Sequence, residues 1–298
     1  MINVIGLGYI GLPTALMMAS HGVEVIGTDY NKQLVETLNA GRTTFKENGL
    51  DELFQSALKA GIKFTTEYQK TDMYIVSVPT PYDKFSKKVD ACYVVAAVKE
   101  VMKVCPKGAT VVIESTVSPG TIDRYVRPVI EENGFNIGED INLVHAPERI
   151  IPGNMVYELL HNNRTVGADS HEIGEKVKKY YASFCQGDIV VTDIRTAEMT
   201  KVVENTFRAV NNFSKLRIVS NKKPRINRDT MSTYTRTWLK NIYARVHITD
   251  TNDLVNVHII MPTYPCKLIS KSDVDSTKSI FNEFSHLRCT NISNNNIT

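Results

Sequence analysis

The sequence predicts an α/β fold over most of its length, with a doubly wound parallel sheet covered by helices on both faces. Short apolar runs of strand length alternate with stretches of helical length along residues 1–195. A glycine-rich turn separates the first apolar run from the first helical stretch. Loops rich in proline, threonine and glutamate follow several later runs. Such regular alternation predicts a parallel sheet that binds its ligand at the carboxyl ends of the strands.

The first unit of this pattern carries a dinucleotide-binding signature. Residues 2–5 (INVI) are expected to form a buried strand, and Gly6, Gly8 and Gly11 of the following GLGYIG match G-x-G-x-x-G. The glycines allow a sharp turn, close approach of the backbone to a pyrophosphate, and packing of the helix on the strand. The helix N-terminus then presents free N–H groups to the phosphates. We expect a Rossmann-like domain in which Tyr9 and Ile10, between the glycines, also contact the cofactor.

An acidic residue at the end of the second predicted strand indicates which dinucleotide binds. Asp29 ends the run VEVIGTD, about 20 residues beyond the glycines. A carboxylate there accepts hydrogen bonds from a ribose 2′-hydroxyl and repels a 2′-phosphate. The predicted cofactor is therefore NAD, in preference to NADP.

Further strand–loop–helix units follow in order along the chain. Residues 73–81 and 141–149 are each expected to form a strand that runs into a loop, and residues 110–115 a strand. Helices are expected at 90–105 and 121–133, with Asp90 as the N-cap of the first. The loops VPTP, ESTVSPGT and HAPERIIPG lie at strand ends and should meet around one crevice. They contribute Pro79, Thr80, Thr116 and Glu148 to the predicted site.

Residues 196–211 (TAEMTKVVENTFRAVN) read as an amphipathic helix that begins a central helix. Its predicted apolar stripe is Met199, Val202, Val203, Phe207 and Val210. Lys201 and Asn205, four positions apart, project from one face and could stabilise an alkoxide or oxyanion. From spacing alone, a solvated surface lysine and a neutral helix residue remain an alternative.

Six blocks in order (GLGYIGLP, VPTP, ESTVSPGT, HAPERIIPG, NNRTVG and RTAEMTKVVENTFRAVN) resemble the nucleotide-sugar 6-dehydrogenase (UDP-glucose/GDP-mannose dehydrogenase) family over residues 2–211. The resemblance implies that two NAD oxidise a sugar C6 alcohol to a carboxylate through a thioester on a cysteine. It assigns Thr116 to holding a catalytic water, Glu148 to acid–base work and thioester hydrolysis, and Lys201 with Asn205 to the reacting C6 oxygen. A pairing of Glu148 with the neighbouring Arg149 is equally expected.

The resemblance also suggests a substrate. Pro152 of PERIIPG stands where the UDP-glucose branch typically carries a second glutamate. The blocks look most like the branch that oxidises UDP-N-acetyl-D-mannosamine, which takes part in polysaccharide and capsule biosynthesis. UDP-glucose and UDP-N-acetylglucosamine remain alternative substrates, and a non-catalytic NAD-binding fragment is an alternative of another class.

Residues 212–298 do not continue this pattern. They hold 13 Lys and Arg against 6 Asp and Glu, and no glycine follows Gly187 in a chain of 16 glycines. The family's later G-x-G-G-H-C segment, which supplies its nucleophile, is not found, and we expect the helix that forms the family's homodimer to be cut short after Asn211. We therefore expect residues 212–298 to be a non-family, poorly ordered tail, with a strand at 255–261 (VNVHIIM) and impaired catalysis.

Composition limits the other possibilities. The five cysteines show neither CxxC pairing nor histidine partners at metal spacing, so no disulfide framework or metal site is expected. No apolar run approaches the roughly 20 residues that cross a bilayer. We expect a cytoplasmic protein whose partners are NAD and a nucleotide sugar, with no nucleic acid and no membrane.

Overall fold

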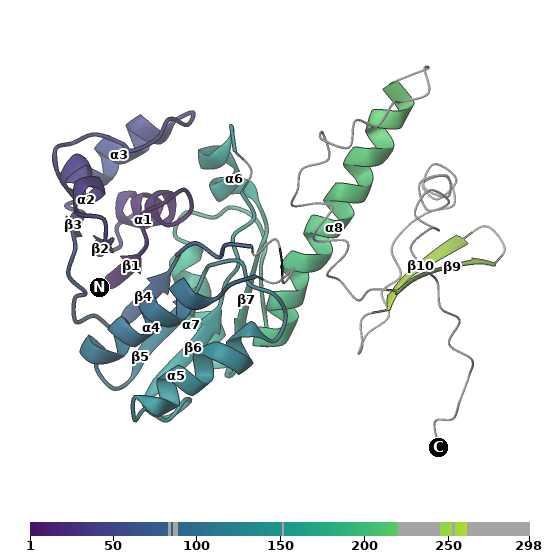
Figure 1. Ribbon diagram of the computed structural model, residues 1–298. Helices are drawn as coiled ribbons and strands as arrows, with labels where there is room; N and C mark the ends of the chain where they lie inside the picture. The colour runs from purple at the N-terminus through teal and green to yellow at the C-terminus, as the bar shows by residue number, and fades with distance from the viewer. Residues whose placement is uncertain (83–84, 86–88, 151, 220–244, 252–253, 261–298) are drawn as a thin grey trace. The chain divides into compact units, whose positions relative to one another are not determined.

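The computed structural model describes residues 1–82, 85, 89–150, 152–219, 245–251 and 254–260 (Figure 1). Two compact units divide the chain, Met1–Glu204 and Asn205–Thr298. In the second unit, β9 (Arg245–Thr251) and β10 (Leu254–Ile260) pair in antiparallel register. The strand predicted at 255–261 corresponds to β10, whereas most of the predicted tail lies outside the described residues.

The first unit is built on one eight-stranded sheet in the order β3-β2-β1-β4-β5-β6-β7-β8. β1 pairs in parallel with both β2 and β4, so the chain winds outward in both directions from this point. Only the β6–β7 pairing is antiparallel within this sheet. The predicted Rossmann-like α/β fold is thus confirmed. The strands are β1 (Ile2–Ile5), β2 (Val25–Thr28), β3 (Lys63–Thr65), β4 (Met73–Val76), β5 (Ala109–Ile113), β6 (Ile141–His145), β7 (Arg164–Ala168) and β8 (Ile189–Thr192).

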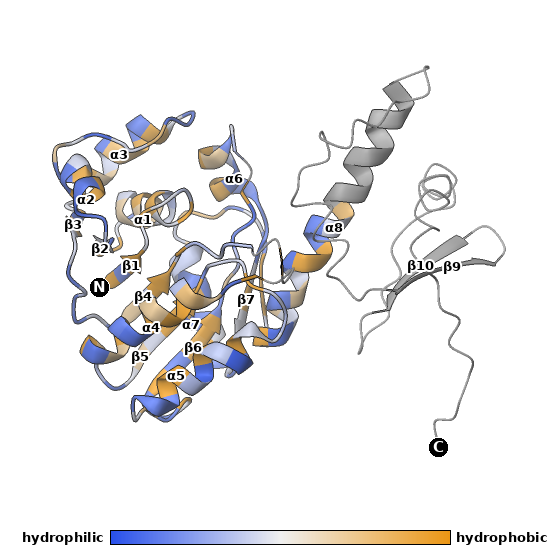
Figure 2. Cartoon of the chain, viewed as in Figure 1, coloured by the Kyte–Doolittle hydropathy of each residue, from blue (hydrophilic) through white to orange (hydrophobic). Residues whose placement is uncertain are grey.

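Helices cover both faces of the sheet, and neighbouring side chains along a strand alternate between them. Met73 and Ile75 of β4 pack with α1, α3, α6 and α7, whereas Tyr74 and Val76 pack with α4 and α5. Figure 2 shows strands that are largely hydrophobic and helices along which hydrophobic and hydrophilic residues alternate. The helices are α1 (Gly11–Ser20), α2 (Lys32–Asn39), α3 (Leu50–Lys59), α4 (Cys92–Val104), α5 (Arg127–Glu132), α6 (Met155–His161), α7 (His171–Tyr181) and α8 (Ile194–Val219).

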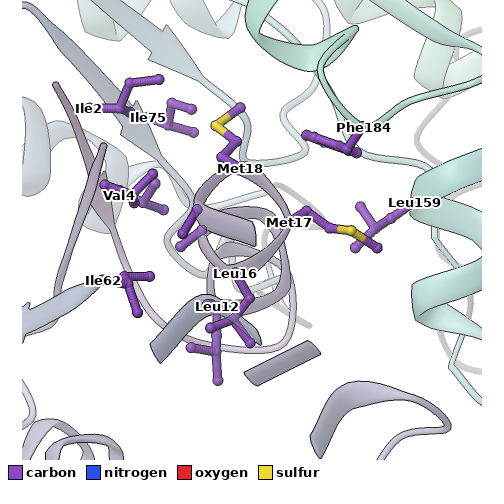
Figure 3. Close-up of a cluster of buried hydrophobic side chains, with 14 of the residues drawn as sticks. Ile2, Val4, Leu12, Leu16, Met17, Met18, Ile62, Ile75, Leu159 and Phe184 are labelled. Carbon is purple, nitrogen blue, oxygen red and sulfur yellow. The ribbon is translucent and has the colours of Figure 1, made fainter. Parts of the chain in front are cut away.

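α1 lies at the centre of one core layer, and its residues from Gly11 to Ala19 are all buried. Figure 3 shows Leu12, Leu16, Met17 and Met18 of α1 among side chains from β1, β4 and α6. A helix that is apolar all round requires burial on every side. This packing fixes the helix that begins at the glycine turn.

Some predicted elements differ from the observed ones. The helix predicted at 121–133 begins as a π-helical turn, η1 (Ile122–Val126), and continues as α5. Pro128 has no N–H to donate, so a regular α-helical ladder is interrupted near this junction. Asp90 accepts a hydrogen bond from Cys92 N at 2.8 Å, one residue before the helix cap at Ala91.

The helix predicted at 196–211 is longer than expected. α8 runs from Ile194 to Val219, because neither glycine nor proline interrupts the chain in this span. The predicted apolar stripe is also wrong: of its described side chains only Val202 is buried, and Phe207 is 42% exposed. The buried face instead combines Ile194, Ala197, Glu198, Lys201 and Val202. This buried face includes polar residues whose partners lie elsewhere in the first unit. A search for periodically spaced apolar residues does not detect a face of this kind.

No helix among the described residues is both long and apolar enough to cross a membrane.

The packing of α1 gives a first prediction. Leu16→Ala should lower the free energy of unfolding by about 2–5 kcal/mol, because Leu16 is fully buried and its removal leaves a cavity. Urea denaturation followed by circular dichroism measures the change. Gln55→Ala, at an exposed position of α3, is the matched control and should change stability by less than about 0.5 kcal/mol. Equal effects of the two substitutions would contradict the central position of α1.

Candidate cofactor and reaction site

The glycine turn after β1 has no room for side chains at two of its three glycines. Gly6 has φ of 88°, and a Cβ there would lie 2.5 Å from the carbonyl oxygen of Ser77. A Cβ on Gly11 would lie 1.9 Å from the carbonyl oxygen of Gly6. By contrast, a Cβ on Gly8 would meet nothing within 4 Å, and Gly8 is exposed. The turn is therefore closed toward β4 and open at Gly8, as a bound pyrophosphate requires.

α1 begins at this open side without a side-chain cap. Ile10 precedes the helix and makes no side-chain capping hydrogen bond, and no acidic residue lies in the first turn. Backbone N–H groups at an uncapped helix start, together with the helix dipole, favour an anionic ligand. Tyr9 and Ile10 are half-buried on the same turn. The residues present here fit the diphosphate of a dinucleotide.

Asp29 lies at the end of β2, as predicted, and also braces the glycine turn. Its Oδ2 accepts a hydrogen bond from Leu7 N and its Oδ1 accepts one from Asn31 N, both at 2.8 Å. A carboxylate has about four lone-pair positions, so capacity remains for the hydroxyls of a ribose. The bracing contact with Leu7 was not visible in the sequence, since it joins residues 22 positions apart.

The loops after β4 and β5 meet through hydrogen bonds. Thr80 Oγ1 donates to the carbonyl oxygen of Thr116 at 2.8 Å. Val78 N donates to Ser115 Oγ at 2.9 Å, and that hydroxyl donates to the carbonyl oxygen of Val78 at 2.7 Å. The structure therefore brings Thr80 and Thr116 together, with Pro79 exposed between these contacts.

Glu148 follows β6 and is almost fully buried. Its Oε1 accepts hydrogen bonds from Arg149 N at 2.5 Å and Ile150 N at 3.1 Å, and its Oε2 forms an ion pair with Arg164. The expected pairing with the Arg149 side chain is wrong, because that guanidinium lies 2.6 Å from Glu204 of α8. The sequence suggested Arg149 because it is adjacent to Glu148 in the chain. In the folded structure the ion-pair partner of Glu148 is instead Arg164 of β7.

Arg164 stands between two buried carboxylates, and the second one was missed in the sequence. Its Nη1 lies 3.8 Å from Oε1 of Glu114, at the end of β5, and its guanidinium carbon lies 4.6 Å from the centre of the Tyr181 ring. Glu114 also accepts hydrogen bonds from Ser77, from Thr14 at 3.2 Å and from Tyr181 at 3.2 Å. The sequence did carry a signal for this cluster, namely a charged residue at one end of a strand-length run: Glu114 ends TVVIE and Arg164 begins RTVGA.

Burial changes the proton affinity of two groups near these loops. It raises the pKa of Glu114 to about 7, an effect that Glu148 reinforces and Arg164 opposes. Burial lowers the pKa of His145 to about 4, and Nδ1 of this side chain bonds to the carbonyl oxygen of Ile113 at 2.8 Å. His145 is therefore a neutral structural group, while Glu114 titrates near neutral pH.

Lys201 of α8 is buried, with 8% of its surface exposed. The alternative of a solvated lysine is therefore excluded. Asn205 lies one turn further along α8 and is half-buried. Their spacing on one helix agrees with the predicted pair, and their joint role in the reaction stays a prediction.

Cysteine and metal chemistry can be described only in part. Cys92 is exposed and Cys105 and Cys185 are buried, all as free thiols, whereas Cys266 and Cys289 lie outside the described residues. Within the part of the chain that the structure describes, no group of three or more His, Cys, Asp or Glu residues could hold a metal ion.

Comparison with known proteins identifies the family of the first part of the chain. Residues 1–185 match the family model described as "UDP-glucose/GDP-mannose dehydrogenase family, NAD binding domain". The chain therefore belongs to the UDP-glucose/GDP-mannose dehydrogenase family, and residues 1–185 are its NAD-binding domain.

Individual relatives share the same region. A UDP-N-acetyl-D-mannosamine dehydrogenase from Methanococcus aeolicus is 38% identical over 245 residues, covering 76% of this chain and 55% of the relative. An NDP-N-acetyl-D-galactosaminuronic acid dehydrogenase from Ralstonia solanacearum is 37% identical over 250 residues, covering 76% and 59%. The structure of the UDP-N-acetyl-mannosamine dehydrogenase Cap5O from Staphylococcus aureus is 43% identical, with a TM-score of 0.66, covering 72% and 54%. This chain spans a little over half the length of these relatives.

The buried Glu114 predicts a pH dependence of stability. Because its folded-state pKa of about 7 exceeds the ordinary value of 4.5, the folded state binds this proton more tightly than the unfolded state. The resulting stability is present below pH 4.5 and is lost as the pH rises through about 7. Glu114→Gln, which stays neutral, should remove this loss, which is on the order of 3 kcal/mol.

Urea unfolding of both proteins across this pH range measures the effect. The difference in unfolding free energy between wild type and Glu114→Gln should change as the pH rises, because wild type loses stability. The difference between wild type and Glu132→Gln, a change at an exposed position of α5, should stay constant. Parallel curves for wild type and Glu114→Gln would contradict the prediction, because they would show that the pKa of Glu114 is the same in the folded and unfolded states.

Asp29 predicts cofactor selectivity. Asp29→Ala should weaken NAD binding roughly ten- to a hundredfold, because hydrogen bonds to a charged acceptor contribute about 1.5–3 kcal/mol. NADP binding should weaken far less, since repulsion of its 2′-phosphate disappears as well. Titration calorimetry measures both affinities, and Asp72→Ala, just before β4 at the opposite end of the sheet, is the control. An unchanged NAD affinity in Asp29→Ala would remove Asp29 from the cofactor site.

Proposed function

We propose that this chain supplies the cofactor-binding and acid–base parts of an NAD-dependent nucleotide-sugar 6-dehydrogenase. The observation that carries the proposal is the buried ammonium of Lys201 on α8, in a chain whose first 185 residues are a family NAD-binding domain. Lysine side chains are seldom buried in proteins, so a buried lysine on a helix that docks on an NAD-binding domain favours a functional role.

Each site residue has a role in this proposal. Bound NAD would supply the acceptor for a hydride from C6 of the sugar. Lys201 and Asn205 stabilise the oxygen on C6 as its proton leaves, since donors aimed at a developing negative charge lower the barrier. Glu148 takes part in proton transfer, and Thr116 orients water. Arg164 and the amides of Arg149 and Ile150 hold the Glu148 carboxylate in one orientation.

The proposed substrate is UDP-N-acetyl-D-mannosamine. The two relatives that carry this name, at 38% and 43% identity, support it, as does Pro152 in the loop after β6. The relative named for an N-acetyl-galactosaminuronic acid leaves the configuration of the amino sugar to be tested. The full oxidation to a uronate consumes two NAD and one water, with the released protons passing to solvent.

A turnover assay with matched variants tests the function. The full chain is incubated with NAD and, separately, UDP-N-acetyl-D-mannosamine, UDP-N-acetylglucosamine and UDP-glucose, while NADH absorbance and the oxidised sugar's mass are recorded. Oxidation at C6 should be fastest with the mannosamine nucleotide. Lys201→Met should reduce kcat by about 10²–10³-fold, because one oxyanion donor is lost, and should leave the NAD affinity unchanged.

Binding of NAD without oxidation of any of the three sugars would overturn the catalytic proposal and favour the non-catalytic NAD-binding fragment. Turnover that is unaffected by Lys201→Met would remove Lys201 from the reaction. Preference for UDP-glucose would overturn only the choice of substrate.

A further inference from the structure

Two carboxylates of α8 attach this helix to the NAD-binding domain, one on each side of Lys201. Glu198 is buried, and its Oε2 and Oε1 accept hydrogen bonds from Gly120 N at 2.6 Å and Ile122 N at 2.9 Å. Glu204 Oε2 lies 2.6 Å from Arg149 Nε. Both acids therefore contact segments that follow strands of the sheet, at the start of η1 and after β6.

The spacing of these residues places Lys201 between the two attachments. Glu198 and Glu204 are each three positions from Lys201 on a continuous helix. Three residues correspond to about 4.5 Å along the helix axis and about 60° around it. Along the axis, one carboxylate therefore lies before Lys201 and the other after it, and around the axis they lie on opposite sides of it. Neither rotation nor sliding of this part of α8 is possible without breaking one of the attachments.

Arg149 links the second attachment to the candidate acid–base residue. Its guanidinium contacts Glu204 and also donates from Nη1 to the carbonyl oxygen of Asn163 at 3.0 Å. Its backbone N–H donates to Oε1 of Glu148. The side chains of Arg149 and Glu204 are 28% and 15% exposed, so solvent screens this pair less than a surface pair. One residue thus joins α8 to the loop that carries Glu148.

We propose that Arg149, Glu198 and Glu204 are positioning residues that hold Lys201 in a fixed place relative to Glu148. The catalytic purpose of this placement rests on the proposed function. The placement itself can be measured without turnover. None of the three residues needs to contact the substrate. They keep the amine of Lys201 and the carboxylate of Glu148 at a fixed distance and orientation, although these groups come from segments about 50 residues apart in the sequence.

Chemical labelling of Lys201 in the full-length chain tests this placement. Acetylation by an activated acetate ester is followed by peptide mass spectrometry, with the exposed Lys59 of α3 as an internal reference. Glu204→Gln and Arg149→Met should each raise the labelling rate of Lys201 about tenfold relative to Lys59, because local opening of α8 becomes more frequent. The rate at Lys59 should not change.

A charge-swapped variant separates positioning from general destabilisation. Arg149→Glu combined with Glu204→Arg restores opposite charges and should return the Lys201 labelling rate to within about threefold of wild type. NAD affinity should stay at the wild-type value in all variants, since these side chains do not contact the glycine turn. Glu198→Gln, which keeps one acceptor oxygen, should raise labelling less than Glu204→Gln does.

Unchanged labelling of Lys201 in both single variants would overturn the proposal, as would a swapped variant that labels as fast as they do. Where the wild type oxidises a UDP-sugar, kcat should fall in the single variants with KM unchanged and recover in the swapped one. Absence of turnover in the wild type bears on the proposed function alone, because the labelling result stands without it.

Discussion

The ion pairs of Arg164 are the interactions on which the site most depends. Its guanidinium is buried between Glu148 and Glu114, beside the ring of Tyr181. Removing one partner from such a group leaves an uncompensated buried charge, which costs several kcal/mol. Through these partners Arg164 connects the ends of β5, β6 and β7 with α7. β6 and β7 are antiparallel and pair through their ends, Val144 with Ala168 and His145 with Gly167, so the start of β7 lies beyond β6, beside the loop that carries Glu148.

The cofactor edge of the sheet depends on the same cluster. Glu114 accepts hydrogen bonds from Thr14 of α1 and from Ser77 after β4, and the Ser77 carbonyl lies against Gly6. Asp29 holds the other side of the glycine turn through Leu7 N. The turn is thus braced from β2 on one side and from β4 and β5 on the other. A rigid frame of this kind keeps the open side at Gly8 available for the ligand.

α8 docks on the segments that follow β5 and β6. Hydrophobic contact alone would leave the rotation of an amphipathic helix loosely defined, because apolar side chains have no preferred partner. The directional hydrogen bonds that Glu198 accepts from Gly120 N and Ile122 N, together with the ion pair of Glu204, remove that freedom. Lys201 is buried as a consequence of this docking, and not because of its own polarity.

The sequence alone determined the fold class, the glycine turn, the position of Asp29 and the strand-end loops with Thr80, Thr116 and Glu148. These features follow from local periodicity and spacing, which a linear sequence contains. Elements between the motifs were not predicted: α2, β3, α6 and β8 are short or irregular in pattern. Only the tertiary structure decided the partner of Glu148, the buried Glu114 and the true buried face of α8. Each of these depends on contacts between charged groups that are tens of residues apart in the sequence. The periodicity of a sequence does not show which of its charged residues will form a pair.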